Sequence, residues 1–125
     1  MLHKTLLPAL TFLLGTAFLL ATGGTAPAWA HAYPQSRSPA AGSTVAAPPS
    51  VTIVFDDALE PKFSHIAVLN AKGAHMEAGA AGPGADSHTL TVPLKPLPPG
   101  RYTVKWQATD EDTHRTHGSY SFTVK

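Results

Sequence analysis

The sequence contains no cysteine, and this absence limits its chemistry at once. Without cysteine, the chain forms neither disulfides nor thiolate metal sites. Methionine is scarce too, because Met76 is the only one beyond Met1. Of the seven histidines, all except His3 follow residue 30, and imidazole is the commonest metal ligand in proteins. Any metal site is therefore expected to use mainly histidine and carboxylate groups.

The chain also lacks an excess of charge of either sign. Of its nine Lys and Arg residues only Lys4 precedes residue 31, so eight cationic residues remain against eight Asp and Glu. No run of basic residues occurs anywhere. Such a neutral composition suggests an evenly mixed surface and gives no electrostatic reason to expect nucleic acid or an anionic membrane as a partner.

The first 30 residues predict a secretory signal peptide. A short cationic start at Lys4 precedes an apolar stretch over residues 6–21, and Ala28-Trp29-Ala30 fits a small-x-small cleavage site. The apolar stretch falls short of the roughly 20 residues that a transmembrane helix needs. We expect cleavage after Ala30, no membrane anchor afterwards, and one mature domain over residues 31–125. Its predicted location is the periplasm, or outside the cell if the host has no outer membrane.

Period-two alternation of apolar and polar residues, bounded by turn residues, predicts an all-β fold for the mature domain. The clearest case is the run in which Tyr102, Val104, Trp106 and Ala108 share one face and are expected in the core. Strands are predicted over residues 32–37, 51–55, 65–70, 89–94, 102–109 and 120–124. This spacing leaves room for about seven strands, the scale of an immunoglobulin-like sandwich.

Several polar segments lie between these strands. Asn70-Ala71-Lys72-Gly73 predicts a hairpin turn, and residues 78–86 a glycine-rich loop. Residues 110–118 are too rich in charge and histidine for a core and are interpreted as a polar connection. His65 falls in a predicted strand, where we expect it to be partly buried and hydrogen-bonded.

Cleavage after Ala30 would create a chelating group at the new N-terminus. The free α-amino nitrogen and the imidazole of His31 can bind one metal ion together through a closed ring. The α-amine has a reference pKa near 8, so a metal displaces its proton readily at neutral pH.

Asp112-Thr113-His114 offers the second half of a site. In extended backbone, residues two apart project to the same side, so Asp112 and His114 could converge on one ion. Asp110 has the same parity and is a competing oxygen ligand. His117 could be an extra ligand, a residue that orients the ligands, or a surface histidine, and the last two are favoured. Two imidazoles, an amine and a carboxylate suit tetragonal Cu(II), although Zn(II) accepts the same donors.

Three groups of short segments occur in a characteristic order along the mature chain. They are His31-Ala32 followed by Ser38-Pro39-Ala40-Ala41-Gly42-Ser43, then Pro98-Pro99-Gly100-Arg101-Tyr102 leading to Trp106, and then Asp112-Thr113-His114 continuing to Val124. In these segments and their order the mature chain resembles the CopC family of secreted copper-resistance proteins. This resemblance implies a Greek-key β-sandwich or barrel that holds one Cu(II) per chain through His31, Asp112 and His114.

The resemblance also implies a role, and one departure from it is informative. The implied role is that of a periplasmic copper chaperone or buffer that passes copper to an inner-membrane importer of the CopD type. The protein is expected to be a monomer. Better-known members hold Cu(I) in a methionine-rich loop, and Met76 beside His75 cannot reproduce such a cluster. Because soft thioether ligands select Cu(I), we predict a protein that binds Cu(II) only.

Two other classes of function share some of these features. A copper-dependent oxidative enzyme, such as a polysaccharide monooxygenase, also uses an N-terminal histidine chelate. In this chain, Asp112 would occupy the position that oxygen activation needs open, so no enzymatic activity is expected. In a metal-free immunoglobulin-like adhesion or scaffolding module, His31 and the loop that carries His114 would be incidental. The metal hypothesis fails if the first strand does not bring residue 31 beside this loop.

Overall fold

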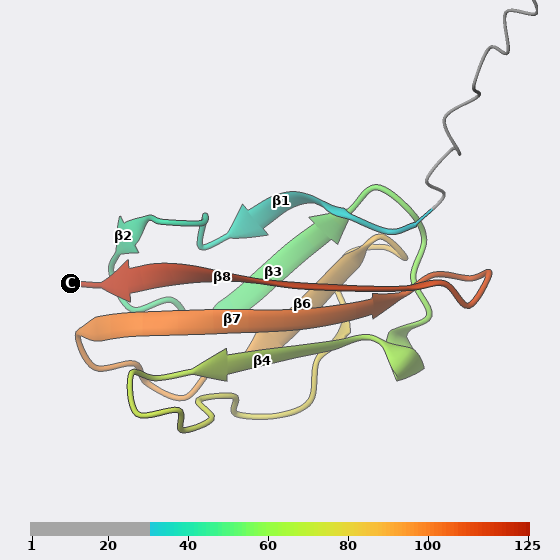
Figure 1. Ribbon diagram of the computed structural model, residues 1–125. Helices are drawn as coiled ribbons and strands as arrows, with labels where there is room; N and C mark the ends of the chain where they lie inside the picture. Colours follow the sequence, from blue (N-terminus) through green and yellow to red (C-terminus); the bar gives the residue numbers. More distant parts are fainter. Residues whose placement is uncertain (1–30) are drawn as a thin grey trace, which may run out of the picture.

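The computed structural model describes residues 31–125 and shows two packed β-sheets. The predicted signal peptide lies outside the described residues. One sheet has the strand order β1-β3-β6-β5 and the other the order β2-β8-β7-β4 (Figure 1). The strands are β1 (Pro34–Ser38), β2 (Thr44–Val45), β3 (Ser50–Phe55), β4 (His65–Leu69), β5 (Gly82–Pro83), β6 (Thr89–Pro93), β7 (Gly100–Thr109) and β8 (Arg115–Val124).

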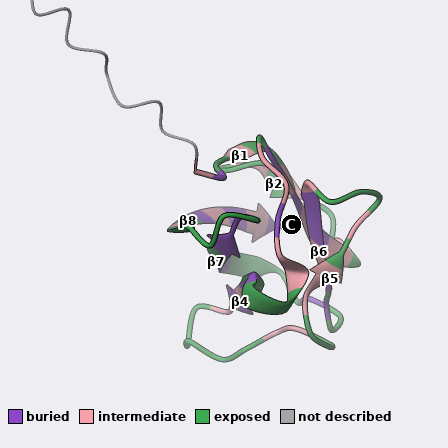
Figure 2. Cartoon of the chain, turned by 90° about the vertical axis from the view of Figure 1, so that its right-hand side faces the viewer, coloured by how far each residue is buried: buried purple, intermediate pink, exposed green. Residues whose placement is uncertain are grey.

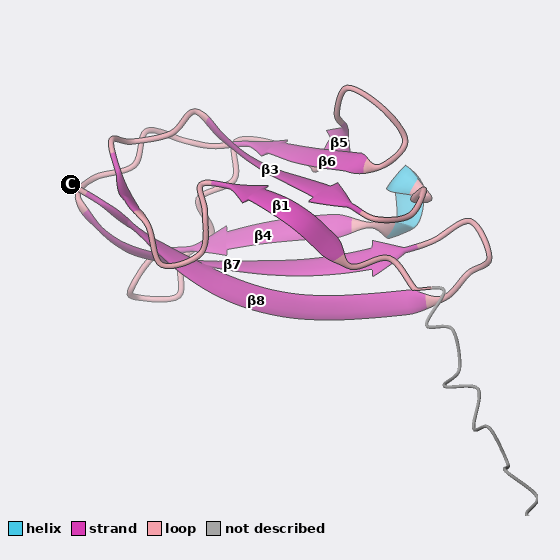
Figure 3. Cartoon of the chain, turned by 90° about the horizontal axis from the view of Figure 1, so that it is seen from above, coloured by secondary structure: helices cyan, strands magenta, loops and turns pink. Residues whose placement is uncertain are grey.

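The predicted all-β sandwich is confirmed. Within residues 31–125 the one helical element is a 3-10 turn, η1 (Pro61–Phe63), which the sequence analysis did not predict. The eight strands include β2 and β5, each of two residues, so the expectation of about seven strands is close. In this part of the chain no helix has the length and apolar character needed to cross a membrane. Figure 3 shows the two layers from above.

The core lies between the sheets and follows the predicted alternation. In β7, Tyr102, Val104, Trp106 and Ala108 are all buried, while Lys105 and Gln107 between them are exposed (Figure 2). β3 repeats the pattern. The rings of Phe55 and Trp106 meet edge to face across the two sheets, with centroids 5.4 Å apart, so aromatic packing joins the layers near one end of the sandwich.

Two expectations about the polar segments were wrong. His65 is exposed, because the parity of β4 buries Ile66 and Val68 on the inner face and turns His65 to the outer one. The connection after β7 is shorter than predicted, because β8 already begins at Arg115. The polar residues 115 and 117 belong to the outer face of this strand. The turn after Asn70 is confirmed, with the amide of Gly73 donating to the Asn70 carbonyl.

Candidate metal centre

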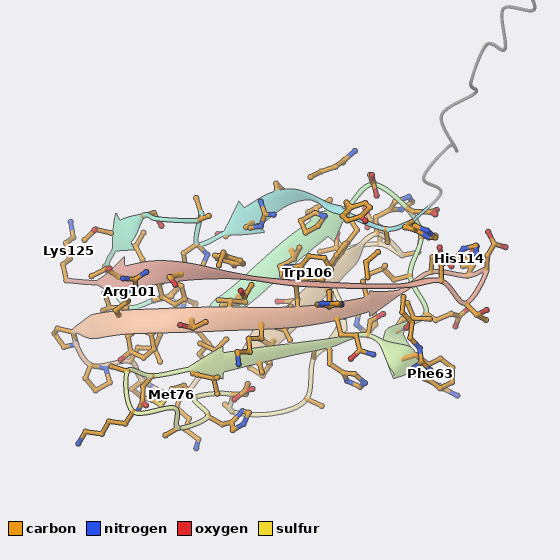
Figure 4. The ribbon with its side chains drawn as sticks, viewed as in Figure 1. Phe63, Met76, Arg101, Trp106, His114 and Lys125 are labelled. Carbon is orange, nitrogen blue, oxygen red and sulfur yellow. The ribbon has the colours of Figure 1, made fainter. Side chains whose placement is uncertain are left out.

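The first described residues and the β7–β8 turn meet at one end of the sandwich. His114 lies in this turn, at the end from which β8 starts (Figure 4). β1 begins at the same end, because Pro34 pairs with Phe55 at the close of β3. The fold therefore brings together two segments that are separated by most of the domain in sequence.

Three hydrogen bonds hold Ala32 and Tyr33, the two residues that follow His31. Ala32 is 1% exposed, and its carbonyl accepts a hydrogen bond of 2.6 Å from the hydroxyl of Thr116 in β8. The amide of Tyr33 donates to Oδ1 of Asp56 at 2.7 Å, and the Asp56 amide donates back to the Tyr33 carbonyl. Position 31 is thus held beside β8 by the residues that follow it.

Asp110 organises the turn that carries His114. Its side chain is 1% exposed, and its Oδ1 accepts a hydrogen bond of 2.9 Å from the His114 amide. Its Oδ2 lies 3.2 Å from Nδ1 of the His114 ring. With Nδ1 donating to the carboxylate, Nε2 of His114 is the nitrogen that keeps its lone pair for a metal.

The turn itself is tight and left-handed at one residue. The Asp110 amide donates to the His114 carbonyl, and the Thr113 amide donates to the Asp110 carbonyl. Thr113 has a φ of 68°, in the region that few residues other than glycine adopt readily. Such strain at a non-glycine residue is common where a side chain is positioned for function.

His31, Asp110 and His114 form the one group of metal-ligand type within residues 31–125. One ligand atom from each lies within 4.8 Å of the others. The two imidazole rings stand edge to face, with centroids 4.7 Å apart. The donor set combines imidazole nitrogen with carboxylate oxygen, which suits a divalent transition metal such as Cu(II) or Zn(II).

The predicted residues are thus only partly brought together. His31 and His114 meet as expected, but Asp112 is exposed and is not one of the three grouped residues. Residues 110–114 form a turn and not the extended backbone in which Asp112 and His114 were expected to project to the same side. The carboxylate that the fold places beside both histidines is Asp110.

His117 does not reach this group. It lies in β8, paired with Gln107 of β7, and its side chain is on the exposed outer face of the sheet. A direct role in orienting His31 or His114 is therefore not supported by its position. The parity of β8 explains this, because Thr116 is the inward residue that contacts Ala32.

The distribution of charge along the fold was not predicted from the sequence. The loop after β3 lies beside the β7–β8 turn, because the Glu60 amide donates to the Thr109 carbonyl and Leu59 bridges to Asp110. As a result, seven of the eight Asp and Glu residues gather at the end that holds the histidines: Asp56, Asp57, Glu60, Asp86, Asp110, Glu111 and Asp112. A neutral composition therefore conceals an acidic end, which attracts cations.

Comparison with known proteins identifies consistent relatives. A family described as CopC domain matches residues 34–125. "Copper resistance protein C" of Escherichia coli is 39% identical over 106 residues, covering 78% of this chain and 84% of that protein. "Copper transport protein CutJ" of Bacillus subtilis is 33% identical over 99 residues, which are 77% of this chain and 18% of that protein.

A solved structure agrees with these relatives. PcoC, described as a methionine-rich copper resistance protein from Escherichia coli, superposes with a TM-score of 0.70 at 38% identity. The match covers 77% of this chain and all of that one. Fold and sequence similarity thus point to the same relatives.

Proposed function

Because this chain belongs to the CopC family of copper-resistance proteins, we propose that it is exported, cleaved after Ala30, and binds one Cu(II) ion tightly at the end of the sandwich. It acts as a copper chaperone or buffer in the periplasm, or outside the cell if the host lacks an outer membrane. The observation that carries the proposal is the meeting of His31 with His114 and Asp110 within 4.8 Å.

In the proposed site, the amine and ring of His31 chelate the ion and Nε2 of His114 adds a second imidazole. Asp112 supplies the carboxylate, as in the family that the sequence resembles, from its exposed position two residues before His114. Asp110 orients His114, because both of its oxygens already face donors on that residue. Copper is the cargo, and the acidic end concentrates it near the site.

Cu(II) titration of two matched proteins tests the chelate. One begins at His31, and the other retains residues 26–30 before it, so the fold is unchanged while the free α-amine is moved five residues along the chain from His31. The extended form should bind Cu(II) much more weakly, with an altered EPR spectrum. Equal affinity in the two forms would show that the amine is not a ligand, and equally tight Zn(II) binding would contradict the choice of copper.

Cu(I) binding distinguishes this chain from its methionine-rich relative. Met76 is partly buried against the core and is the only methionine after residue 30. A single thioether cannot build a Cu(I) site of several soft ligands. In a competition titration with a Cu(I) chelator, the chelator should retain the metal. Tight retention by the protein would refute a carrier restricted to Cu(II).

The proposed destination of the copper is an inner-membrane importer of the CopD type. The support is indirect: the Bacillus subtilis relative is called a copper transport protein, and the domain shared with this chain is only 18% of its length. A copper-binding domain that is part of a larger transport protein is well placed to deliver its metal to the rest of that protein. We propose that this chain acts as a monomer when it delivers copper to such an importer.

A further inference from the structure

A row of side chains on the outer face of the second sheet is not used by the proposed copper centre. His65 of β4 pairs with Gln107 of β7, and Gln107 pairs in turn with His117 of β8. All three residues are exposed and line one groove of about 550 Å³, which also includes Lys105 and Ser119. The fold thus places two histidines on either side of a glutamine, across three hydrogen-bonded strands.

We propose that His65 and His117 form a second, weaker Cu(II) site in this groove. Neighbouring Cα atoms across antiparallel strands are alternately about 4.5 and 5.5 Å apart, so the two histidine backbones are about 10 Å apart. Each imidazole extends its Nε2 well beyond its Cα, and a metal–nitrogen bond adds about 2 Å on either side. One ion above Gln107 is therefore within reach of both rings.

The composition of the groove favours Cu(II) among the divalent metals. Imidazole suits copper, zinc and nickel, and Cu(II) has the highest affinity in this series for a given nitrogen site. The amide oxygen of Gln107, between the rings, is placed to complete the coordination together with water. No carboxylate lines this groove and Lys105 is nearby, so binding there is weaker than at the acidic end.

The same donors could instead bind an anion. Lys105, the two histidines and the hydroxyl of Ser119 are all potential hydrogen-bond donors to a carboxylate or phosphate. An anion would be bound best by a cationic side chain at the centre of the groove. The residue at the centre is the neutral Gln107, and Lys105 lies to one side, paired with Ser119. A metal ion is therefore the favoured ligand. The two chemistries are separated by the experiment below.

The experiment uses a protein in which His31 and His114 are both replaced by alanine, so that the N-terminal metal site is disabled. Cu(II) is titrated into this form and into its His65→Ala and His117→Ala variants, with His75→Ala as the matched control because His75 is also exposed but lies outside the groove. All three positions are at the surface, so the fold should be kept, and circular dichroism checks this. NMR of the same samples locates the bound ion through paramagnetic broadening.

This His31→Ala, His114→Ala protein should bind one Cu(II) with nitrogen hyperfine structure in its EPR spectrum and with broadened resonances of Gln107 and Ser119. Both groove variants should lose this binding, while His75→Ala should keep it. Unchanged binding in the groove variants, or equal loss in His75→Ala, would overturn the site. Shifts on adding inorganic phosphate but not Cu(II) would show an anion site instead. Neither result bears on the N-terminal site, which is tested by the form that begins at His31.

Discussion

Replacing Asp110 with asparagine tests whether this buried carboxylate sets the metal-binding nitrogen of His114. In the wild type, Oδ1 accepts from the His114 amide and Oδ2 faces Nδ1 of the ring. Asparagine keeps one oxygen for the amide, but its NH₂ group then faces Nδ1 and requires that nitrogen to accept. The proton must move to Nε2, which can no longer bind the ion without breaking the new contact.

The size of the effect follows from the role of such supporting groups. Loss of a hydrogen-bond partner that orients a metal-bound histidine typically costs 10- to 100-fold in metal affinity, or about 1.4 to 2.7 kcal/mol. Because Asp110 is 1% exposed, water cannot replace the lost acceptor. The turn also loses a hydrogen bond to a charged acceptor, worth about 1.5 to 3 kcal/mol, so the variant should unfold at lower urea concentration.

The assay is competition with a Cu(II) chelator, followed by EPR, on proteins that begin at His31. Asp110→Asn should bind 10- to 100-fold more weakly, with the change greatest in the hyperfine structure of one imidazole. Asp112→Asn is the comparison, and it should change the oxygen ligand while leaving the tautomer of His114 intact. Wild-type affinity and spectrum in Asp110→Asn would refute the reasoning. Complete loss in Asp110→Asn with no effect in Asp112→Asn would make Asp110 the ligand itself.

Three further substitutions test a buried hydrogen bond, the packing of a glycine and the burial of a tyrosine in the sandwich. Thr116→Val removes the donor to the buried Ala32 carbonyl; it should cost about 1 to 3 kcal/mol in urea unfolding and weaken Cu(II) binding in the same competition assay. Gly118→Ala would place a Cβ 2.6 Å from the Trp106 ring, and this overpacking should cost about 1 to 3 kcal/mol, measured by tryptophan fluorescence during denaturation. Burial raises the pKa of Tyr120 from 10.0 to about 12. The folded state therefore keeps the Tyr120 proton to higher pH than the unfolded state does. The contribution of Tyr120 to stability is complete below pH 10 and is lost as the pH rises through about 12. Tyr120→Phe should remove this loss when unfolding is measured as a function of pH. Unchanged unfolding midpoints in the first two variants, or an identical alkaline profile in the third, would contradict these assignments.

The strands were predictable from the sequence because their signals are local. In β7 the alternation from Tyr102 to Ala108 fixes which face is buried, and the structure confirms each of these inward positions. Turn residues such as Asn70 and Gly73 likewise act within a few positions of themselves. These patterns needed no knowledge of which strands would pair.

The finer details of the site depend on contacts that no local pattern encodes. Extended backbone gives Asp110 and Asp112 the same parity, so only the family resemblance favoured Asp112, and the turn at Thr113, with its positive φ, was not predicted. The groove between His65 and His117 depends on the register of three strands, and the acidic end depends on loops from different hairpins lying side by side. Only the family resemblance linked His31 to His114 before the fold was known.

The arrangement around His31 suggests that folding and processing build the centre in two separate steps. Ala32 and Tyr33 are anchored by their own backbone groups, so position 31 is set beside His114 whatever precedes it. The α-amine, in contrast, is an amide nitrogen for as long as Ala30 is attached, and an amide nitrogen is a far poorer ligand at neutral pH. With cleavage after Ala30, as we propose, the amine is released at a place that the fold has already prepared, so no further rearrangement is needed to bind copper. Tight binding is thereby restricted to the processed protein, which keeps the precursor from holding copper tightly before export.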